Sequence, residues 1–495
     1  MSRSTIFRCG IALGAAVPLA SADVYWHGVA HAPNWGNPLA WDQMAVPGES
    51  DTARLSANIT LGAMSNDTAV IRRLVLDDTQ STPVIDLIGK TLQVMDGGTW
   101  KWGGFSNNDT EPGTVDLYGT MTLAGTDSTV YTAGLGVNLN NRWIIEHGGD
   151  GTLAVQSYYN YYTHEFTGDG EIANSAATGN LMTNDGVTLK TGGTGVSIIE
   201  PEFLNIGEVE VQSGTLLIQN PVDIDGSTLT GGKWTARNGS TLILDAAQAL
   251  ETNEGSLTLA RSGSSIIVGP SPIEDTLLAN HAHLTVTENR TFANTLHNTL
   301  RFWIGSGGTV TVNINNDGWV GVTGSPGLAT IDGDVTFGPT GKFDVSLGGI
   351  TPVTEHDVIE VNGTVQADGT IIVRNLNGFD LNDYPEGTSW DVVRATEITG
   401  TFNRAVYIDG PDAFLDVEYA YGVDGRDIVR IVYVRRPCNP ADIAEPVGVL
   451  DLSDIGAFIN AFIAGDPLAD IAEPFGILDL SDVNEFVSSF VSGCP

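Results

Sequence analysis

The sequence predicts a mainly β protein, a right-handed parallel β-solenoid followed by a small α-helical tail. Three observations support this prediction. Short strand-like pieces with alternating apolar and polar side chains recur through the chain, and Gly, Asn, Asp and Ser separate them. No amphipathic helical pattern interrupts this series between residues 56 and 430. The last residues, from Cys438 onward, instead carry a loop and a helical pattern written twice.

Residues 1–22 have the pattern of a secretory signal peptide. Arg3 and Arg8 form a basic start, residues 11–19 an apolar centre, and residues 20–22 a small-residue cleavage site. No later stretch is long and apolar enough to span a membrane, so no membrane insertion is expected. The chain is therefore predicted to be secreted or held at the cell surface.

The chain is strongly acidic, with 60 Asp and Glu against 22 Lys and Arg and a net charge of −38. This charge repels polyanions, which argues against nucleic acids and anionic membranes as partners. It suits an exterior that contains calcium. The 60 glycines favour many turns over many helices.

Residues 23–55 are rich in aromatic side chains. They contain Trp26, Trp35 and Trp41, followed by Val46-Pro47 and Asp51-Thr52-Ala53. This opening resembles the start of passenger-like β-solenoid proteins of bacterial surfaces. The resemblance implies an N-terminal cap, which a stack of coils needs to shield its open end. A sugar-binding platform of tryptophans is the alternative.

Residues 56–320 are predicted to form the solenoid body, because strands this short bury little alone but can stack as coils. One or two β-sandwiches remain the alternative. Residues 321–436 continue the pattern with pieces such as Phe343-Asp344-Val345 and Trp390-Asp391-Val392-Val393. The order of these pieces resembles the last coils of autotransporter passengers, which implies C-terminal solenoid coils.

Residues 437–495 contain a 28-residue unit twice, from Ala441 and from Ala469. After each loop, apolar residues recur at helical spacing and a glycine follows where a helix would end. The apolar faces comprise Ile455, Phe458, Ile459 and Phe462 in the first copy and Val483, Phe486, Val487 and Phe490 in the second. Neither helix is long enough to be stable alone, so the two faces are expected to pack together.

Each loop has the acidic spacing of a calcium loop. With Asp454 as its last ligand, Asp451 and the Val449 carbonyl occupy earlier ligand positions, Asp442 lies one residue early, and Glu445 supplies a substitute oxygen. The second loop repeats the set as Asp470, Glu473, Ile477, Asp479 and Asp482. The alternative is that these carboxylates only cap helices and solvate the loops.

The tandem resembles the type I dockerin family, whose members carry two calcium loop–helix units. The resemblance covers the tail alone. It implies calcium as the cofactor and a cohesin-like or other surface protein as the partner. By the same resemblance, the partner-binding residues would be Leu452, Ser453, Leu480 and Ser481.

Cys438 and Cys494 stand at the two ends of the tandem and are the only cysteines left once the leader is removed. A disulfide between them is predicted, because small exported domains commonly need such a crosslink. Two free thiols are the alternative.

Residues 158–166 form the most unusual run in the body. Its aromatic side chains are candidates for stacking on sugar rings, with a polysaccharide as the ligand; they are Tyr158, Tyr159, Tyr161 and Tyr162. The alternative is a pair of strands with tyrosines on both faces. His281 and His283 share one face of an expected strand but lack a visible third metal ligand.

These observations predict an exported, non-catalytic surface or adhesion-type protein that docks to a partner through its tail. The alternative is a polysaccharide lyase or glycoside hydrolase on a β-helix, carried by the same tail. Lysines are scarce, and sequence spacing cannot select a catalytic pair among so many carboxylates. The sequence therefore favours a non-catalytic protein without deciding the question.

Overall fold

The computed structural model describes residues 23–26, 35–38, 41–43, 45–55, 59–61, 67–76, 83–125, 130–176, 178–408, 415–434, 438–444 and 447–494. The predicted signal peptide lies outside these residues. The structure is 51% strand and 8% helix and contains a β-solenoid of about 12 turns, so the mainly β prediction is confirmed. The chain forms two compact units, of which the first ends at Thr276 and the second begins at Leu277.

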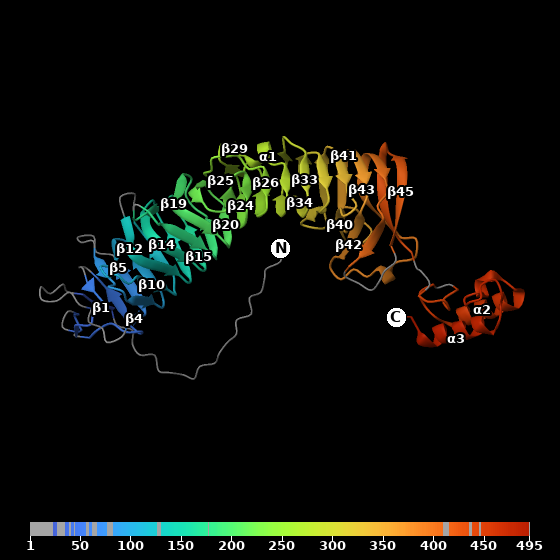
Figure 1. The fold of residues 1–495 in the computed structure, drawn as a ribbon, viewed down its shortest axis with the longest axis horizontal. Coiled ribbons are helices and arrows are strands. Elements are labelled where there is room, and N and C mark those ends of the chain that lie inside the picture. The colour runs from blue at the N-terminus through green and yellow to red at the C-terminus, as the bar shows by residue number, and fades with distance from the viewer. Residues whose placement is uncertain are drawn as a thin grey trace. The chain divides into compact units, whose positions relative to one another are not determined.

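The first unit is a stack of coils whose strands (Figure 1) are mostly parallel and line up in three ladders, with most coils contributing a strand to each. The first ladder comprises β1 (Asp23–Tyr25), β2 (Thr52–Arg54), β5 (Arg73–Leu76), β8 (Gly98–Trp100), β11 (Met121–Leu123), β13 (Ile144–His147), β15 (Thr163–Phe166), β18 (Val187–Lys190), β20 (Glu208–Val211), β24 (Lys233–Arg237) and β27 (Ser256–Ala260). The second comprises β3 (Ile59–Thr60), β6 (Val84–Asp86), β9 (Gly103–Ser106), β12 (Val130–Asn141), β14 (Thr152–Asn160), β16 (Glu171–Asn174), β19 (Val196–Asn205), β21 (Thr215–Pro221), β25 (Thr241–Leu244) and β28 (Ser265–Val268). The third comprises β4 (Thr68–Ile71), β7 (Thr91–Val94), β10 (Gly113–Leu117), β17 (Leu181–Asn184) and the second halves of β12, β14, β19 and β21.

The second unit continues this plan. One ladder consists of β31 (His283–Val286), β34 (Arg301–Gly305), β37 (Trp319–Thr323), β40 (Lys342–Leu347), β42 (Thr370–Asn375) and β44 (Arg404–Tyr407). The other two contain β30 (Ala279–Asn280), β33 (Leu296–Asn298), β36 (Ile314–Asn316) and β39 (Val335–Phe337), and β32 (Arg290–Thr291), β35 (Thr309–Thr311) and β38 (Leu328–Asp332). These two ladders merge in β41 (Val358–Ala367) and β43 (Ser389–Gly400). Strand β46 (Arg426–Tyr433) pairs antiparallel with β43, and β45 (Leu415–Val423) pairs antiparallel with β46.

The strand ladders are parallel apart from β45 and β46 and two short pairs, which excludes the β-sandwich alternative for the described body. Two short helical turns lie within the described body, where the sequence pattern indicates no helix. A single turn, α1 (Ile273–Thr276), and a short 3₁₀ turn, η2 (Leu381–Asp383), lie within the body. Both are too short to show an amphipathic period, which is why the sequence pattern did not indicate them.

Alternation along the strands places apolar side chains inside the coils. In β14, for example, Leu153, Val155 and Tyr158 are buried while the residues between them are partly exposed. In the predicted N-terminal cap, Trp26, Trp35 and Trp41 are at most 2% exposed, and their ring centroids lie 5.1 Å apart in edge-to-face pairs. Rings buried in this way offer no stacking surface, so the sugar-platform alternative is wrong for these three residues.

Buried asparagines stack from coil to coil at the corner after the third ladder. In the first unit, Asn141 donates to Asn160, Asn160 to Asn184 and Asn184 to Asn205, over 2.7–2.8 Å. Each amide also donates to a backbone carbonyl of a following coil, such as Glu208 O for Asn184. The second unit repeats the arrangement with Asn280, Asn298 and Asn316.

The tail contains two helices of equal length, α2 (Leu452–Ala464) and α3 (Leu480–Ser492), with a 3₁₀ turn η3 (Pro467–Ala469) between them. Asp451 and Asp479 are the N-cap residues and form capping boxes with Asp454 and Asp482. Gly465 ends α2 in the left-handed conformation, as predicted. The loop–helix duplication is therefore present.

Replacing Asn184 by Ala is expected to lower the unfolding midpoint of the solenoid strongly. The change leaves Asn160, Thr188, Asn205 and Glu208 O without their buried partner, a cost of about 3 kcal/mol or more. Urea unfolding followed by tryptophan fluorescence measures the effect. The control is Asn220→Ala, which removes one exposed bond to Glu200 O and should leave the midpoint nearly unchanged.

Candidate functional site

The two tail helices pack through their phenylalanines. Phe458 of α2 and Phe486 of α3 are buried, and their rings stack at 4.2 Å with an interplanar angle of 17°. Phe462 and Phe490 flank this pair at 5.8 Å on each side. The contacts follow the duplication. Each phenylalanine packs against the equivalent residue of the other helix or against the phenylalanine one turn away on its own helix.

The packed helices leave a large apolar surface exposed. The side chains farthest from the core are Leu452 (83% exposed), Ile463 (79%), Leu480 (77%) and Val491 (80%). Between the helices lies a groove of about 350 Å³ that is lined only by Ile, Phe and Val side chains from both helices. Of the four predicted partner-binding residues, Leu452 and Leu480 are thus highly exposed; Ser453 and Ser481 are also exposed, beside the N-caps.

The loops fold around the last carboxylate of each copy. Asp454 Oδ1 accepts the N–H groups of Ile443 and Ala444 at 2.8 Å, and its Oδ2 accepts that of Asp451 at 2.9 Å. Asp482 repeats these three bonds in the second loop. The backbone bonds, led by that from Asp479, lower the pKa of Asp482. Both side chains are about 1% exposed.

The same loops do not bring their three carboxylates together as a cation cage. Among the described residues, the one group of three acidic, His or Cys side chains with ligand atoms within 4.8 Å is Cys438, Asp442 and Cys494, and its cysteines are joined to each other. Asp442 Oδ2 accepts from the backbone of Cys438 and Gly448. Its Oδ1, like Asp470 Oδ1, is buried with no hydrogen-bond partner in the described chain.

This geometry supports the capping alternative, and calcium binding stays a prediction. The side chains of Val449 and Ile477 are exposed in their loops. Of the two predicted glutamate ligands, Glu473 lies within the described residues and Glu445 lies outside them. Gly448 and Gly476 have φ of 89° and 90°, which explains why glycine is found at this turn in both copies. The buried oxygens Asp442 Oδ1 and Asp470 Oδ1, one in each loop, have no hydrogen-bond partner among the described residues and could serve a cation.

Cys438 and Cys494 form a disulfide, as predicted, with their Cα atoms 5.4 Å apart. The bond joins the residue before the first loop to the residue after the second helix. Closing a loop of this length stabilises a small domain by about 4 kcal/mol in the chain-entropy model. Asn439 reinforces the closure by donating to the carbonyls of Ser489 and Gly493.

The tyrosines of residues 158–162 lie on both faces of the solenoid's β-sheet, one toward the interior and the others toward the outside. Tyr158 points into the solenoid and is 1% exposed, so it is not available to a sugar. Tyr161 and Tyr162 are 39% and 43% exposed, and Tyr159 stacks on Tyr161 at 4.0 Å. Contact of these three with a polysaccharide stays a prediction.

The preceding coil extends this aromatic surface. Trp143 lies parallel to Tyr162, with ring centroids 4.7 Å apart, and the Arg142 guanidinium lies 4.6 Å from the Tyr161 ring. Sequence reasoning missed both residues because the coil spacing that aligns them with the tyrosines is not visible in a single strand.

Tyr158 starts a buried hydrogen-bond chain. Its hydroxyl lies 2.8 Å from His164 Nδ1, His164 Nε2 lies 3.3 Å from His147 Nδ1, and His147 Nε2 lies 2.7 Å from the Gly151 carbonyl. Because the carbonyl can only accept, His147 carries its proton on Nε2, and each group before it donates forward. Burial lowers the pKa of His147 to about 4 and that of His164 further below its usual value.

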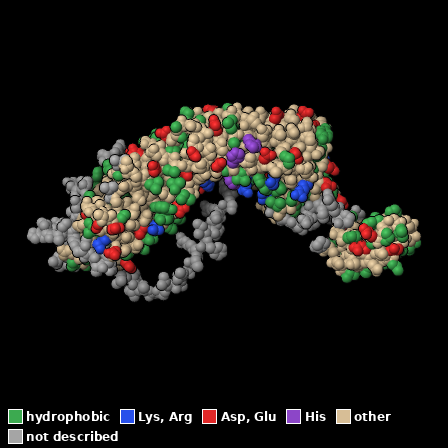
Figure 2. All heavy atoms as spheres, viewed as in Figure 1, with side chains coloured by type: hydrophobic (Ala, Val, Ile, Leu, Met, Phe, Trp, Pro, Cys, Tyr) green, Lys and Arg blue, Asp and Glu red, His purple; other side chains and the backbone are tan. Residues whose placement is uncertain are grey.

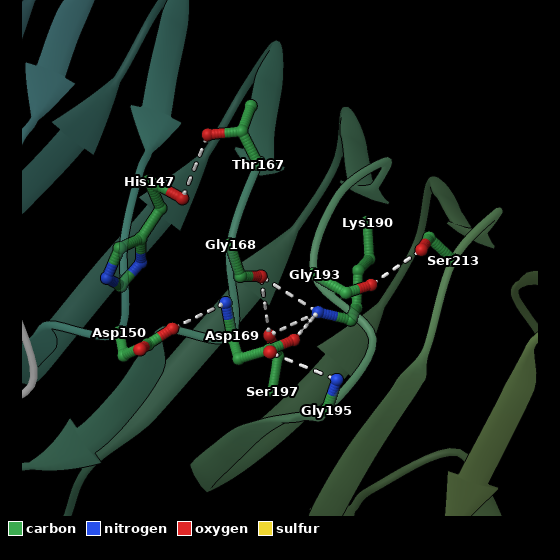
Figure 3. A network of polar contacts seen from close by, with 10 residues as sticks. All are labelled: His147, Asp150, Thr167, Gly168, Asp169, Lys190, Gly193, Gly195, Ser197 and Ser213. Carbon is green, nitrogen blue, oxygen red and sulfur yellow. Dashed lines mark hydrogen bonds and ion pairs between the residues drawn. The ribbon is translucent and has the colours of Figure 1, made fainter.

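Lys190 lies in the same interior and is fully buried (Figure 3). Its Nζ donates to Gly168 O and Asp169 Oδ1 at 2.8 Å and to Ser197 Oγ at 3.0 Å. Burial raises the pKa of Asp169, but bonds from Lys190 and the Gly195 amide outweigh this and lower it. All three Lys190 protons are used, and no substrate reaches a side chain in this position.

A carboxylate pair on the outside of the first unit is the feature closest to the enzyme alternative. Glu171 and Glu200 interact on neighbouring coils, and burial together with Glu200 raises the pKa of Glu171. A hydrolase needs one protonated and one charged carboxylate. Both groups are partly exposed.

No family model matches the chain, and no curated protein matches it either. In the described part of the chain, no helix has both the length and the apolar character needed to cross a membrane. The fold therefore defines the class, a β-solenoid protein with a disulfide-closed pair of helices at its C-terminal end.

The buried histidines should make the body less stable in mild acid. Their folded pKa lies below the unfolded value of about 6.5, so between pH 6.5 and 4 the unfolded chain binds protons that the folded chain does not. Stability should therefore fall as the pH falls, by about 3 kcal/mol from His147 alone. The unfolding midpoint against pH measures this, and His147→Phe with His164→Phe should flatten the slope in that window.

The tail loops should hold their fold through the carboxylate caps. Replacing Asp454 by Ala leaves three loop N–H groups without an acceptor and should destabilise the first unit of the tandem by about 3 kcal/mol. Hydrogen exchange of the full chain should then show α2 unprotected and α3 still protected, with Asp466→Ala as the control. Protection that is lost in chelator and restored by calcium in the unmodified chain would contradict capping and favour the calcium loops.

Proposed function

We propose that the protein is an exported, non-catalytic β-solenoid that is attached to a partner protein through its helical tandem. The observation that carries the proposal is the exposed apolar face of α2 and α3. Side chains of Leu, Ile and Val at 77–83% exposure are costly for a domain surrounded by water, and such patches mark interaction surfaces. The duplicated positions present this face twice, in two nearly equivalent orientations.

The partner is expected to offer an apolar patch with a basic rim. From Cys438 to the end, the chain has ten acidic residues and no Lys or Arg. Figure 2 shows red and green side chains on the tandem and no blue ones on this view. Opposite charge around an apolar centre would steer association and exclude acidic competitors. A cohesin-like protein of this chemistry is the partner that the dockerin resemblance suggests.

The body would then serve as an extended wall for adhesion or surface structure. Its interior titratable groups are buried and hydrogen-bonded to one another, which suits a structural role. A glycoside hydrolase is the second candidate, and Glu171 with Glu200 is the carboxylate pair to test, although carboxyls that hydrogen-bond to each other lie closer than the separation of about 5 Å or more that such enzymes use. Loss of any polysaccharide hydrolysis in Glu171→Gln, against retention in Glu202→Gln, would decide for that candidate.

The docking proposal is tested with charge inserted into the apolar face. Binding of the full chain to recombinant cohesin modules is measured by biolayer interferometry. Ile463→Asp with Val491→Asp should weaken binding by about a hundredfold or more, because buried charge in an interface centre is strongly unfavourable. Asn460→Asp with Ser488→Asp is the control, since these exposed residues are also related by the duplication and the charge change is equal.

Two outcomes would contradict the docking proposal. One is that the face variant binds as well as the control. The other is that no module binds while the unmodified chain self-associates through the same residues, which would make the face a contact between copies.

A further inference from the structure

The outer face of one ladder in the second unit carries a line of basic and aromatic side chains. The strand register places His283, Arg301, Trp319, Lys342, Thr370 and Arg404 in one column across β31, β34, β37, β40, β42 and β44. Neighbouring strands are about 4.8 Å apart, so Arg301, Lys342 and Arg404, each two strands from the next, repeat at about 10 Å.

This face is basic in a strongly acidic chain. Between residues 283 and 407 there are six Lys and Arg and fourteen Asp and Glu. Four of the six cations point outward from this ladder: Arg301, Lys342, Arg374 and Arg404. Asp344 is the one acidic residue at an outward position of its six strands, and Arg374 pairs with it at 2.8 Å. Figure 2 shows Lys and Arg side chains gathered below the region where β34, β40 and β42 lie.

The remaining three cations have no carboxylate within ion-pair distance among the described residues. Lys342 donates to the Thr340 carbonyl, which does not neutralise it. Two carboxylates precede strands of this ladder. Asp317 lies 3.0 Å from His297 Nε2, and Asp368 accepts hydrogen bonds from the Gly369 amide and Asn403. Arg301, Lys342 and Arg404 therefore carry positive charges that form no ion pair within the described part of the chain.

Two tryptophans, Trp319 and Trp303, lie on this face and make different contacts. Arg301, Lys342 and Arg374 lie 5.9, 5.2 and 5.5 Å from the Trp319 ring, so that the indole holds three cations together. Trp303 instead lies over Gly321, where a Cβ would come within 2.0 Å of its ring carbon Cζ3. Glycine at 321 lets this partly exposed indole lie flat on the sheet beside the column.

We propose that this face binds an anionic glycan, whose carboxylate or sulfate groups pair with Arg301, Lys342 and Arg404 and whose sugar ring stacks on Trp303. The spacing of the cations along the column is close to the length of a disaccharide in an extended chain. Guanidinium groups match carboxylates and sulfates with paired hydrogen bonds. The proposal is independent of the docking of the tail.

Single-stranded nucleic acid also combines charge with stacking, but the face favours a glycan. The face has one flat indole beside the column, whereas single-strand binding surfaces stack successive bases on several aromatic rings.

The test uses the full chain and four immobilised probes: polygalacturonate, dextran sulfate, neutral dextran and oligothymidylate. Biolayer interferometry is run at low and at physiological salt. We expect binding to polygalacturonate, dextran sulfate or both, with no binding to dextran. Arg301→Gln with Lys342→Gln should weaken it about tenfold or more, and Trp303→Ala should weaken it at unchanged salt dependence.

The control is Arg72→Gln with Arg73→Gln, which removes the same charge from exposed positions of the first unit. The single variant Lys342→Gln covers the case in which the double variant fails to fold. Equal binding by the variants and the control would overturn the proposal, as would absence of binding to both anionic glycans at low salt. Tighter binding to oligothymidylate than to either glycan, lost in the same variants, would assign the face to nucleic acid instead.

Discussion

The stacked asparagine amides are the interaction on which the rest of the solenoid depends. At each inner corner the backbone turns with its polar groups pointing into a dry interior, where unpaired groups are costly. An Asn side chain offers two N–H donors and a carbonyl acceptor, so it can hydrogen-bond a backbone carbonyl of a following coil and the equivalent Asn side chain of the next coil at the same time. Asn160, Asn184 and Asn205 do this in consecutive coils. Their stacking aligns these coils and thereby fixes the register of the outward columns that cross them.

The same interior tolerates ionisable side chains only where a network satisfies them. His147 and His164 stay neutral because burial outweighs their bonds, and the direction of the Tyr158 chain follows from one carbonyl acceptor. Lys190 remains inside because Asp169, a carbonyl and a hydroxyl take its three protons. These buried groups leave the solenoid stable near neutral pH but make its stability fall in acid. A purely apolar core would not have this pH dependence.

Features that repeat within a short window could be predicted from the sequence. Short sequence spacings predict four features: the alternation of the strands, the duplicated tail, the end of the first tail helix at Gly465 and the Cys438–Cys494 disulfide. The column of Arg301, Trp319 and Lys342 could not, because its members are 18 and 23 residues apart and coil length varies. The same reason hid Trp143 beside Tyr162. The acidic spacing that predicts calcium loops does not distinguish a carboxylate that faces a cation from one that faces backbone amides, as Asp454 does.

Charge is therefore distributed by element, and the net value of −38 describes no single surface. The tail uses the buried carboxylates of Asp454 and Asp482 as acceptors that hold the loops, and presents apolar side chains outwardly. Its affinity for a protein partner should accordingly rest on apolar contact, with charge acting on the rate of encounter. The solenoid face beside Trp319 does the opposite, since its apolar groups order cations whose charge is then available for recognition. As proposed, the two repeat-built surfaces of the chain would select ligands of different chemistry, because a repeat multiplies whatever side chain its register turns toward the solvent.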